Sequence, residues 1–238
     1  MSAASISAAP GPAVIAGNRD PAELSPALSS ALQVVHADAH LLIVDKPAGL
    51  LAVPGRGEAK RDCLATRVQA EFADALVVHR LDQATSGLMV FARGLDAQRR
   101  LSNAFERREV GKRYVAVVAG CPTDASGRID LPLAADWPRR PRQQVDRVHG
   151  KASQTCWRAL GTDAERDCSR LELEPLTGRS HQLRVHLGAI GHPILGDALY
   201  APPEIHRRAP RLLLHASVLE FAHPATGSRV RFASAVPF

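Results

Sequence analysis

The chain has 238 residues, 45% hydrophobic and 23% charged, which is enough for one well-buried globular domain. Its 30 Lys and Arg against 24 Asp and Glu give a net charge of +6, and an excess made mostly of arginine favours a partner rich in phosphate, although an Arg-rich proteome would give the same excess. No apolar run approaches the roughly 20 residues that span a bilayer, and four widely spaced cysteines without a CxxC pair predict reduced thiols and no metal site.

Residues 1–33 are rich in Ala, Pro and Ser and show little periodicity. We therefore expect a flexible tail followed by one domain over residues 34–238. The tail lacks the basic start and the unbroken apolar core of a secretory signal, so we expect a cytoplasmic protein.

Apolar periodicity predicts an α+β domain with a largely antiparallel or mixed sheet. The predicted elements are, in chain order, a strand at 41–44, a helix at 63–72, two strands flanking a polar turn at 79–87, an amphipathic helix at 95–109, a strand at 111–120, an extended arm or loop at 131–147, a strand near 171–176, a helix through 183–190 and strands over 212–221. The glycines form neither a P-loop nor a dinucleotide fingerprint, and no internal repeat is visible.

The polar turn HRLDQATSGL at residues 79–88 presents one carboxylate, Asp82, between two apolar runs. An aspartate after a strand is most often a turn or cap residue. However, Arg80 lies two residues away and would favour the ionised carboxylate, which suits a nucleophile better than a general acid. No second acid stands beside Asp82 in the turn, so a two-carboxylate glycosidase site is not indicated.

A second motif, TGRSHQLRVHL at residues 177–187, continues to GHPILGDALY at 191–200. We expect Arg179, His181 and Arg184 on the first turns of a helix, where free backbone N–H groups attract anions. Capping and surface charge would also explain these residue types.

Two further basic segments leave two interpretations open. The helix at 95–109 carries arginines away from its apolar face, which form either a solvated surface or contacts with an RNA backbone. The arm at 131–147 contains Trp137 among four arginines; it either lies along RNA or is a surface loop that Trp137 anchors to the core.

Together these motifs resemble the RluA-type pseudouridine synthases from about residue 41 to the C-terminus. The resemblance rests on Asp45-Lys46-Pro47, the HRLD turn, Lys112 and Tyr114 on one strand, TGRSHQLRVH, GHPILGD and Arg211-Leu212-Leu213-Leu214-His215-Ala216. It implies the pseudouridine synthase fold, a bent mixed sheet with flanking helices and a central active-site cleft. It also implies isomerisation of uridine in RNA without a cofactor.

The resemblance implies roles for individual residues. Asp82 matches the essential aspartate, Arg184 the arginine that pairs with it, and Tyr114 the tyrosine that stacks on the target base and can remove the C5 proton late in the reaction. Arg80 matches the arginine that fills the RNA stack when the target nucleotide is flipped out. His79, Arg179 and His181 are expected RNA contacts or base-flipping residues.

Asp136-Trp137-Pro138 and the Arg-Pro pattern after it resemble the members of dual specificity, which act on 23S rRNA and on the tRNA anticodon loop. The short tail leaves no room for an S4 domain, which agrees with that subgroup, and we expect a monomer. The alternatives are a synthase for a single rRNA or tRNA site, a non-catalytic RNA-binding protein that would tolerate Asp82→Asn, and an enzyme that acts on free nucleosides or glycosides with little salt dependence.

Overall fold

A computed structural model of the chain describes residues 13–14, 32–55, 57–58 and 61–238. Most of the predicted tail lies outside these residues. Within it, strand β1 (Ala13–Val14) pairs in parallel with β13 (Arg229–Ala233). Strand β2 (Gln33–Ala37) begins at the predicted boundary between tail and domain.

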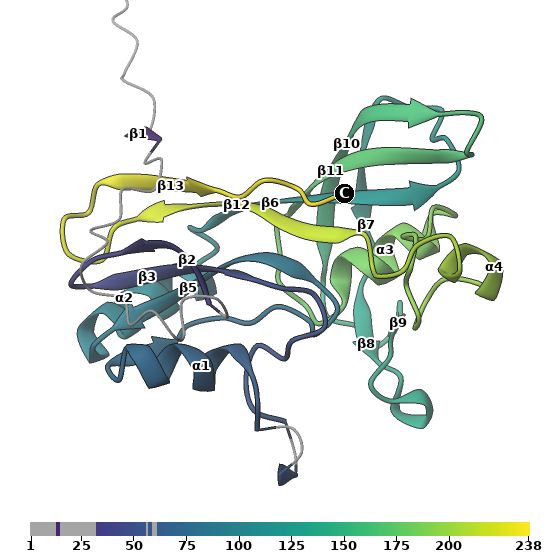
Figure 1. The fold of residues 1–238 in the computed structure, drawn as a ribbon. Helices are drawn as coiled ribbons and strands as arrows, with labels where there is room; N and C mark the ends of the chain where they lie inside the picture. The colour runs from purple at the N-terminus through teal and green to yellow at the C-terminus, as the bar shows by residue number, and fades with distance from the viewer. Residues whose placement is uncertain (1–12, 15–31, 56, 59–60) are drawn as a thin grey trace, which may run out of the picture.

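One long sheet runs through both halves of the molecule (Figure 1). Its strands follow the order β2, β3 (Leu41–Lys46), β5 (Ser86–Arg93), β12 (Leu214–Ala222), β6 (Gly111–Ala119), β11 (Cys168–Pro175), β10 (Gln154–Asp163) and β7 (Ser126–Asp130), with β4 (Ala75–Val77) paired to β5 and β13 paired to β12. The neighbours are antiparallel except for β5 with β12 and β1 with β13. The predicted mixed sheet is therefore confirmed.

Helices α1 (Leu64–Glu71) and α2 (Leu95–Glu106) cover the half that contains β3 and β5. Because side chains alternate along a strand, Leu42 and Val44 of β3 pack with α1 while Leu41 and Ile43 pack with α2. All four side chains are fully buried, and each such burial stabilises the fold by about 1.5–3 kcal/mol. Two helices thus hold β3 and β5 rigidly on both faces.

In the other half, α3 (Gln182–Ala189) packs Leu183 and Leu187 against β6 and β11, and the short α4 (Pro203–His206) follows. The predicted arm is a separate two-stranded hairpin of β8 (Leu133–Ala135) and β9 (Gln143–Val145), joined through the 3-10 turn η3 (Trp137–Arg139). This confirms that the proline-rich segment does not form a regular α-helix.

Helix α2 is shorter than predicted. It ends at Glu106 because Arg107 caps it and Arg108 adopts a positive φ of 62°, which a continuing helix does not allow. The arginines at 107 and 108 therefore lie in the turn before β6 and not on a helix face.

The two halves meet where β5 runs beside β12. Gly87 has φ 115°, and a Cβ at this position would lie 2.3 Å from the carbonyl oxygen of Ala216. Only glycine permits this approach. The contact fixes the start of β5, directly after the turn that contains Asp82.

Candidate active site

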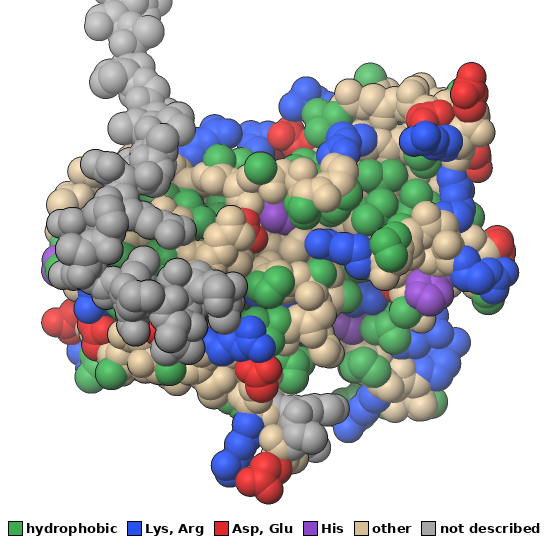
Figure 2. Space-filling model, viewed as in Figure 1, with side chains coloured by type: hydrophobic (Ala, Val, Ile, Leu, Met, Phe, Trp, Pro, Cys, Tyr) green, Lys and Arg blue, Asp and Glu red, His purple; other side chains and the backbone are tan. Residues whose placement is uncertain are grey.

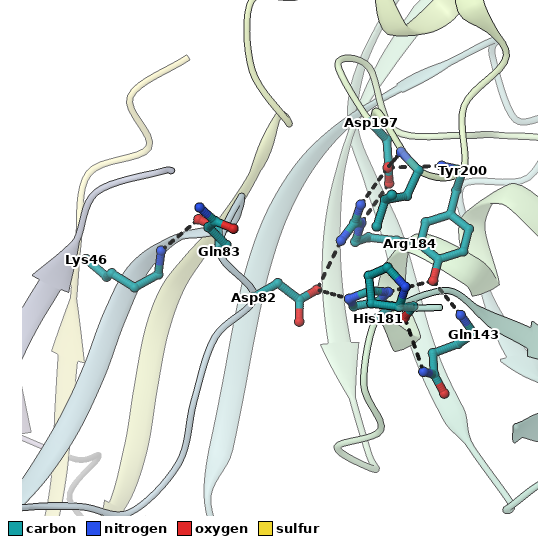
Figure 3. Close-up of polar contacts among 10 residues, drawn as sticks. Lys46, Asp82, Gln83, Gln143, His181, Arg184, Asp197 and Tyr200 are labelled. Carbon is teal, nitrogen blue, oxygen red and sulfur yellow. Dashed lines mark hydrogen bonds and ion pairs between the residues drawn. The ribbon is translucent and has the colours of Figure 1, made fainter. Parts of the chain in front are cut away.

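The turn between β4 and β5 is held from behind by Lys46 at the end of β3 (Figure 3). The Lys46 side chain is fully buried, and its Nζ donates hydrogen bonds to the carbonyl oxygens of Pro47 and Leu50 at 2.8 Å and of Gln83 at 3.1 Å. Burial lowers the pKa of Lys46 to about 8, although the charges of Asp82 and Asp45 oppose the shift. Lys46 therefore links two loops directly beneath Asp82.

The Asp82 carboxylate faces the other half of the molecule, toward Arg184 and His181 (Figure 3). Its Oδ2 lies 3.4 Å from Arg184 Nη1 and 3.9 Å from His181 Nε2, and 27% of the side chain is exposed. Arg184 is thus the partner that the family resemblance implied, whereas the sequence neighbour Arg80 is exposed and forms no hydrogen bond or ion pair within residues 32–55, 57–58 and 61–238. The cation beside Asp82 comes from α3, 102 residues along the chain.

Arg184 is itself held by a second carboxylate. Its Nε and Nη2 donate to Asp197 at 2.8 and 2.7 Å, and Asp197 also accepts from the backbone N–H groups of Leu199 and Tyr200. Only 5% of Arg184 and 1% of Asp197 is exposed. Burial would lower the pKa of Arg184, but Asp197 and Asp82 outweigh it and raise the pKa. A permanent, oriented cation therefore stands beside Asp82.

His181 is held by hydrogen bonds on the side of its ring away from Asp82, and its Nε2 lies 3.9 Å from the Asp82 carboxylate. Its Nδ1 lies 2.6 Å from the Tyr200 hydroxyl, which accepts a hydrogen bond from the Gln143 backbone N–H at 2.8 Å. The Tyr200 hydroxyl therefore connects the His181 ring to the backbone of β9 and fixes the orientation of the ring. Burial lowers the pKa of His181, although the charge of Asp82 opposes the shift.

The expectation that Arg179 and His181 lie in the first turn of the helix is wrong. Helix α3 begins at Gln182, and His181 precedes it in a left-handed conformation with φ 55°. The Gln182 side chain accepts from the Thr177 hydroxyl and from the Arg179 backbone N–H, which pins the loop in place of a helical turn. Arg184 does lie in the first turn, whereas Arg179 is exposed in the loop.

Asp82 opens into a cavity of about 590 Å³ whose wall is formed by Tyr114, His79 and Phe105 together with the cations Arg80, Arg108, Lys112, Arg179 and Arg184. Tyr114 on β6 packs against the cores of both halves. Burial and the charge of Asp82 raise the pKa of the Tyr114 phenol. Tyr114 therefore stays protonated at neutral pH and offers a flat ring beside the carboxylate.

His79 is placed in the wall of this cavity rather than at its mouth. Its Nε2 accepts from the Val90 backbone N–H at 3.1 Å, and its ring stacks on Phe105 with centroids 4.5 Å apart. Burial, helped by Lys112, lowers the pKa of His79 to about 3. The His79 ring is therefore neutral. Its predicted contact with RNA would rest on van der Waals packing and not on charge.

Lys112 is a cavity cation to which the sequence alone assigned no role. It lies two residues before Tyr114, on the same face of β6. Burial and the nearby Arg108 lower its pKa, and in the described part of the chain its ammonium group forms no hydrogen bond or ion pair. A half-buried cation without an acidic neighbour is suited to a phosphate group.

Lys46, Asp197 and Tyr200 were also missed as parts of the site. Each stands in a motif that supported the family resemblance, but the motif letters do not show which side chains meet. The described residues contain no group of three or more His, Cys, Asp or Glu arranged to hold a metal ion. Among them, no helix has the length and apolar character that crossing a membrane requires.

Comparison with known proteins places this site in a family. Residues 40–189 match the family model described as RNA pseudouridylate synthase. The dual-specificity RNA pseudouridine synthase RluA of Escherichia coli strain K12 is 49% identical over 207 residues, which are 87% of this chain and 94% of that protein. The protein of the same name from Haemophilus influenzae is 43% identical over 210 residues, 88% of this chain and 95% of that protein.

A solved structure agrees with the sequence relatives. Human RNA pseudouridylate synthase domain containing 1 superposes with a TM-score of 0.74 at 28% identity and covers 90% of this chain and 87% of its own. The predicted pseudouridine synthase fold is thereby confirmed. The chain belongs to the RNA pseudouridylate synthase family and is an isomerase that converts uridine in RNA to pseudouridine.

Proposed function

We propose that this isomerase modifies specific uridines in both 23S rRNA and the anticodon loop of tRNA, with Asp82 as the reacting carboxylate. The observation that carries the proposal is the Asp82 carboxylate, which is held by Arg184 and opens into the cavity that Tyr114 lines. The dual specificity is supported by relatives of 43% to 49% identity that are named dual-specificity synthases.

The reaction has to break the N1–C1′ bond, turn the uracil while it stays bound and join C5 to C1′. C5 loses a proton and N1 gains one, so atoms and electrons balance without a cofactor. Asp82 can add to C1′, remove a ribose proton to give a glycal, or attack uracil C6. In each route the carboxylate must be correctly aimed, and the buried Arg184 holds it at 3.4 Å.

Tyr114 serves first as the platform on which the flipped uracil stacks. The raised pKa keeps the Tyr114 phenol protonated at neutral pH. The phenol is therefore not a ready base, and it can accept the C5 proton only by releasing its own proton in the same step. The contacts from Gln143 through Tyr200 hold the His181 ring with its Nε2 3.9 Å from the Asp82 carboxylate. His181 thus orients the carboxylate from a second side.

The target atoms are out of reach in stacked RNA, so the nucleotide has to leave the stack. Arg80 is exposed beside Asp82 and carries a guanidinium free to fill the vacancy. Arg108, Lys112 and Arg179 line the same cavity without an ion pair to an acid in the described residues, and they are placed to hold the phosphates of the flipped strand. His79 completes the wall behind the base.

The proposal includes a monomer that works in the cytoplasm. The proposed substrates, rRNA and tRNA, support the cytoplasm.

Tritium release from RNA labelled with 5-³H-uridine tests the function. Bulk tRNA and 23S rRNA from a strain that lacks the endogenous activity are incubated with the wild type and with Asp82→Asn. We expect release from both RNAs by the wild type and from neither by the variant. Release from one RNA only would contradict the dual specificity, and equal release by the variant would contradict the role of Asp82.

A further inference from the structure

The arm between β8 and β9 carries an aromatic side chain that the fold does not use. Trp137 is 67% exposed, so it does not anchor the arm to the core. A tryptophan on a surface often marks a contact site, because its large ring is apolar and its N–H can donate a hydrogen bond. Its function therefore lies outside the packing of the domain.

Arg140 covers one face of this ring. Its guanidinium carbon lies 3.5 Å from the centroid of Trp137, a stacked cation–π contact. Arg140 forms no ion pair within the described residues. The high exposure of Trp137 leaves the opposite face of its ring to solvent, so the pair presents a flat surface backed by a positive charge.

The turn that carries Trp137 is built to hold one shape. Asp136 is buried, its backbone N–H donates to the Arg142 carbonyl, and its carboxylate pairs with Arg139 at 2.7 Å. The neighbouring Gln143 is bonded to Tyr200, and through Tyr200 to His181 beside Asp82. The strand that follows the turn is therefore tied, through Gln143 and Tyr200, to the residues around the reacting carboxylate (Figure 3).

A second cavity, of about 770 Å³, is lined by both Trp137 and Asp82. Asp82, Arg80 and Arg184 line it at one end, Trp137 and Arg140 line it at the other, and residues 51–53 form an apolar wall. Figure 2 shows the surface hollowed between the arm and the segment that precedes α1, with Lys and Arg side chains gathered around the arm. The volume suits one nucleotide, and Asp82 stands between this cavity and the one lined by Tyr114.

We propose that Trp137, backed by Arg140, stacks on an unpaired nucleobase of the substrate RNA next to the target uridine. The inference rests on the proposed function and adds a second base-binding site to it. The target enters the Tyr114 cavity, and its neighbour along the strand leaves the stack into the Trp137 cavity. Stacking tolerates every base, so this site selects an unpaired, splayed strand rather than a sequence, which two RNAs of different sequence can share.

Activity measurements on three variants test the proposal. Trp137→Ala removes the ring, Trp137→Phe keeps a smaller ring, and Val148→Ala changes another exposed apolar side chain, in the turn that follows β9. The substrate is tRNA from the synthase-deficient strain labelled with 5-³H-uridine. Loss of one base stack raises KM about tenfold with kcat unchanged in Trp137→Ala, whereas Trp137→Phe and Val148→Ala stay within about threefold of the wild type.

Fluorescence provides a readout that does not need catalysis. The chain has two tryptophans, and stacking of a base on Trp137 quenches its emission. Addition of the same tRNA should quench the wild type and Val148→Ala, and the quench should be largely lost in Trp137→Phe, where only Trp157 remains. Circular dichroism shows whether each variant is folded.

The outcomes separate this inference from the proposed function. Unchanged KM in Trp137→Ala, or the same quench in Trp137→Phe as in the wild type, would overturn the stacking site. Absence of tritium release from the wild type would sink the proposed tRNA specificity, and the quench measurement would still decide whether Trp137 stacks on RNA. A fall in kcat alone would assign Trp137 to the chemical step and would also contradict the proposal.

Discussion

Arg184 binds two carboxylates from two loops, and the loops treat their carboxylates in opposite ways. Asp197, in the loop after α3, is almost fully buried and forms two short hydrogen bonds to the guanidinium. Asp82, in the turn before β5, is partly exposed and lies 3.4 Å from Arg184 and 3.9 Å from His181. The same cation is thus fixed by one acid and presented to the other.

This difference teaches how a fold can support a reactive group. A carboxylate that already has several short hydrogen bonds is stabilised as an anion and is a poor nucleophile, whereas a loosely held one keeps lone pairs available for the substrate. Asp197 and Lys46 take on the structural role, the first behind Arg184 and the second behind the turn. Asp82 is left free to react.

The change with the largest expected effect is Asp82→Asn. We expect kcat/KM to fall by about 10⁴-fold or more, because the amide is neither a nucleophile nor a base. The free energy of unfolding should change by less than about 1 kcal/mol, since Arg184 keeps Asp197. Tritium release and urea denaturation measure the two quantities.

Asp96→Asn is the matched control for this variant, because Asp96 is an exposed aspartate at the start of α2. It should keep wild-type activity. If Asp82→Asn lost several kcal/mol of stability, the carboxylate would be structural and the contrast with Asp197 would break.

Asp197→Asn should damage the fold and the reaction together. It leaves the charge of Arg184 buried with a weaker partner, and loss of one member of a buried pair costs about 3–5 kcal/mol. Activity should fall by about 100-fold, because the guanidinium is no longer aimed at Asp82. Full stability with full activity would show that Arg184 is positioned by other contacts.

Lys46→Met tests the support behind the turn. Three backbone carbonyl groups lose their donor, and we expect a loss of about 2 kcal/mol in unfolding free energy, since methionine fills the space and removes a buried charge. Between pH 8 and the ordinary pKa of 10.5 the native lysine has lost its proton while the unfolded one keeps it. The stability of the wild type relative to the variant should therefore rise with pH over this window, in urea titrations.

Asp38 is a carboxylate outside the two cavities that Asp82 lines, and it serves as a reference for the pH dependence of stability. Burial would raise its pKa, but hydrogen bonds from His36, from the His40 and Leu41 backbone and from His223 lower it to about 2, from an ordinary 3.8. A lowered carboxylate pKa stabilises the fold above the unfolded value and loses this effect as pH falls through the native one. Asp38→Asn should cost about 2 kcal/mol at pH 7.

The same urea titrations, continued below pH 4, check the sign for Asp38. The difference between wild type and Asp38→Asn should narrow as pH falls from 3.8 and vanish near 2. Activity at pH 7 should be unchanged, because Asp38 lies in the turn between β2 and β3, outside the cavities that Asp82 lines. A pH-independent difference would rule out the carboxylate charge as its origin.

Local residue patterns in the sequence predicted the secondary-structure elements around Asp82. The apolar runs around residues 79–87 indicated strands that present Asp82, and spacings of four indicated α1. The family motifs identified Arg184 and Tyr114, and the structure brings both to the Asp82 cavity. These predictions succeeded because periodicity and turn chemistry are encoded over a few residues.

Pairings between distant residues could not be read from the chain. The residue pattern alone pointed to the neighbouring Arg80 as the cation beside Asp82, and only the family resemblance indicated Arg184, the partner that the structure shows. Lys46 donates a hydrogen bond to the Gln83 carbonyl oxygen, 37 residues away in the chain. The Gln143 backbone N–H donates to the Tyr200 hydroxyl, 57 residues away. The left-handed His181 before α3 depends on the side chain of Gln182, which a helical pattern does not reveal.

The parallel contact of β5 with β12 has a consequence for the newly made chain. Ser86 reaches its partner His215 only after 129 further residues have been synthesised, which takes roughly 6–26 s at about 5–20 residues per second. Arg184 and Asp197 also emerge within that interval. A chain still on the ribosome therefore carries Asp82 without the strand that fixes its turn, and the protein gains its RNA chemistry only after β12 has been synthesised.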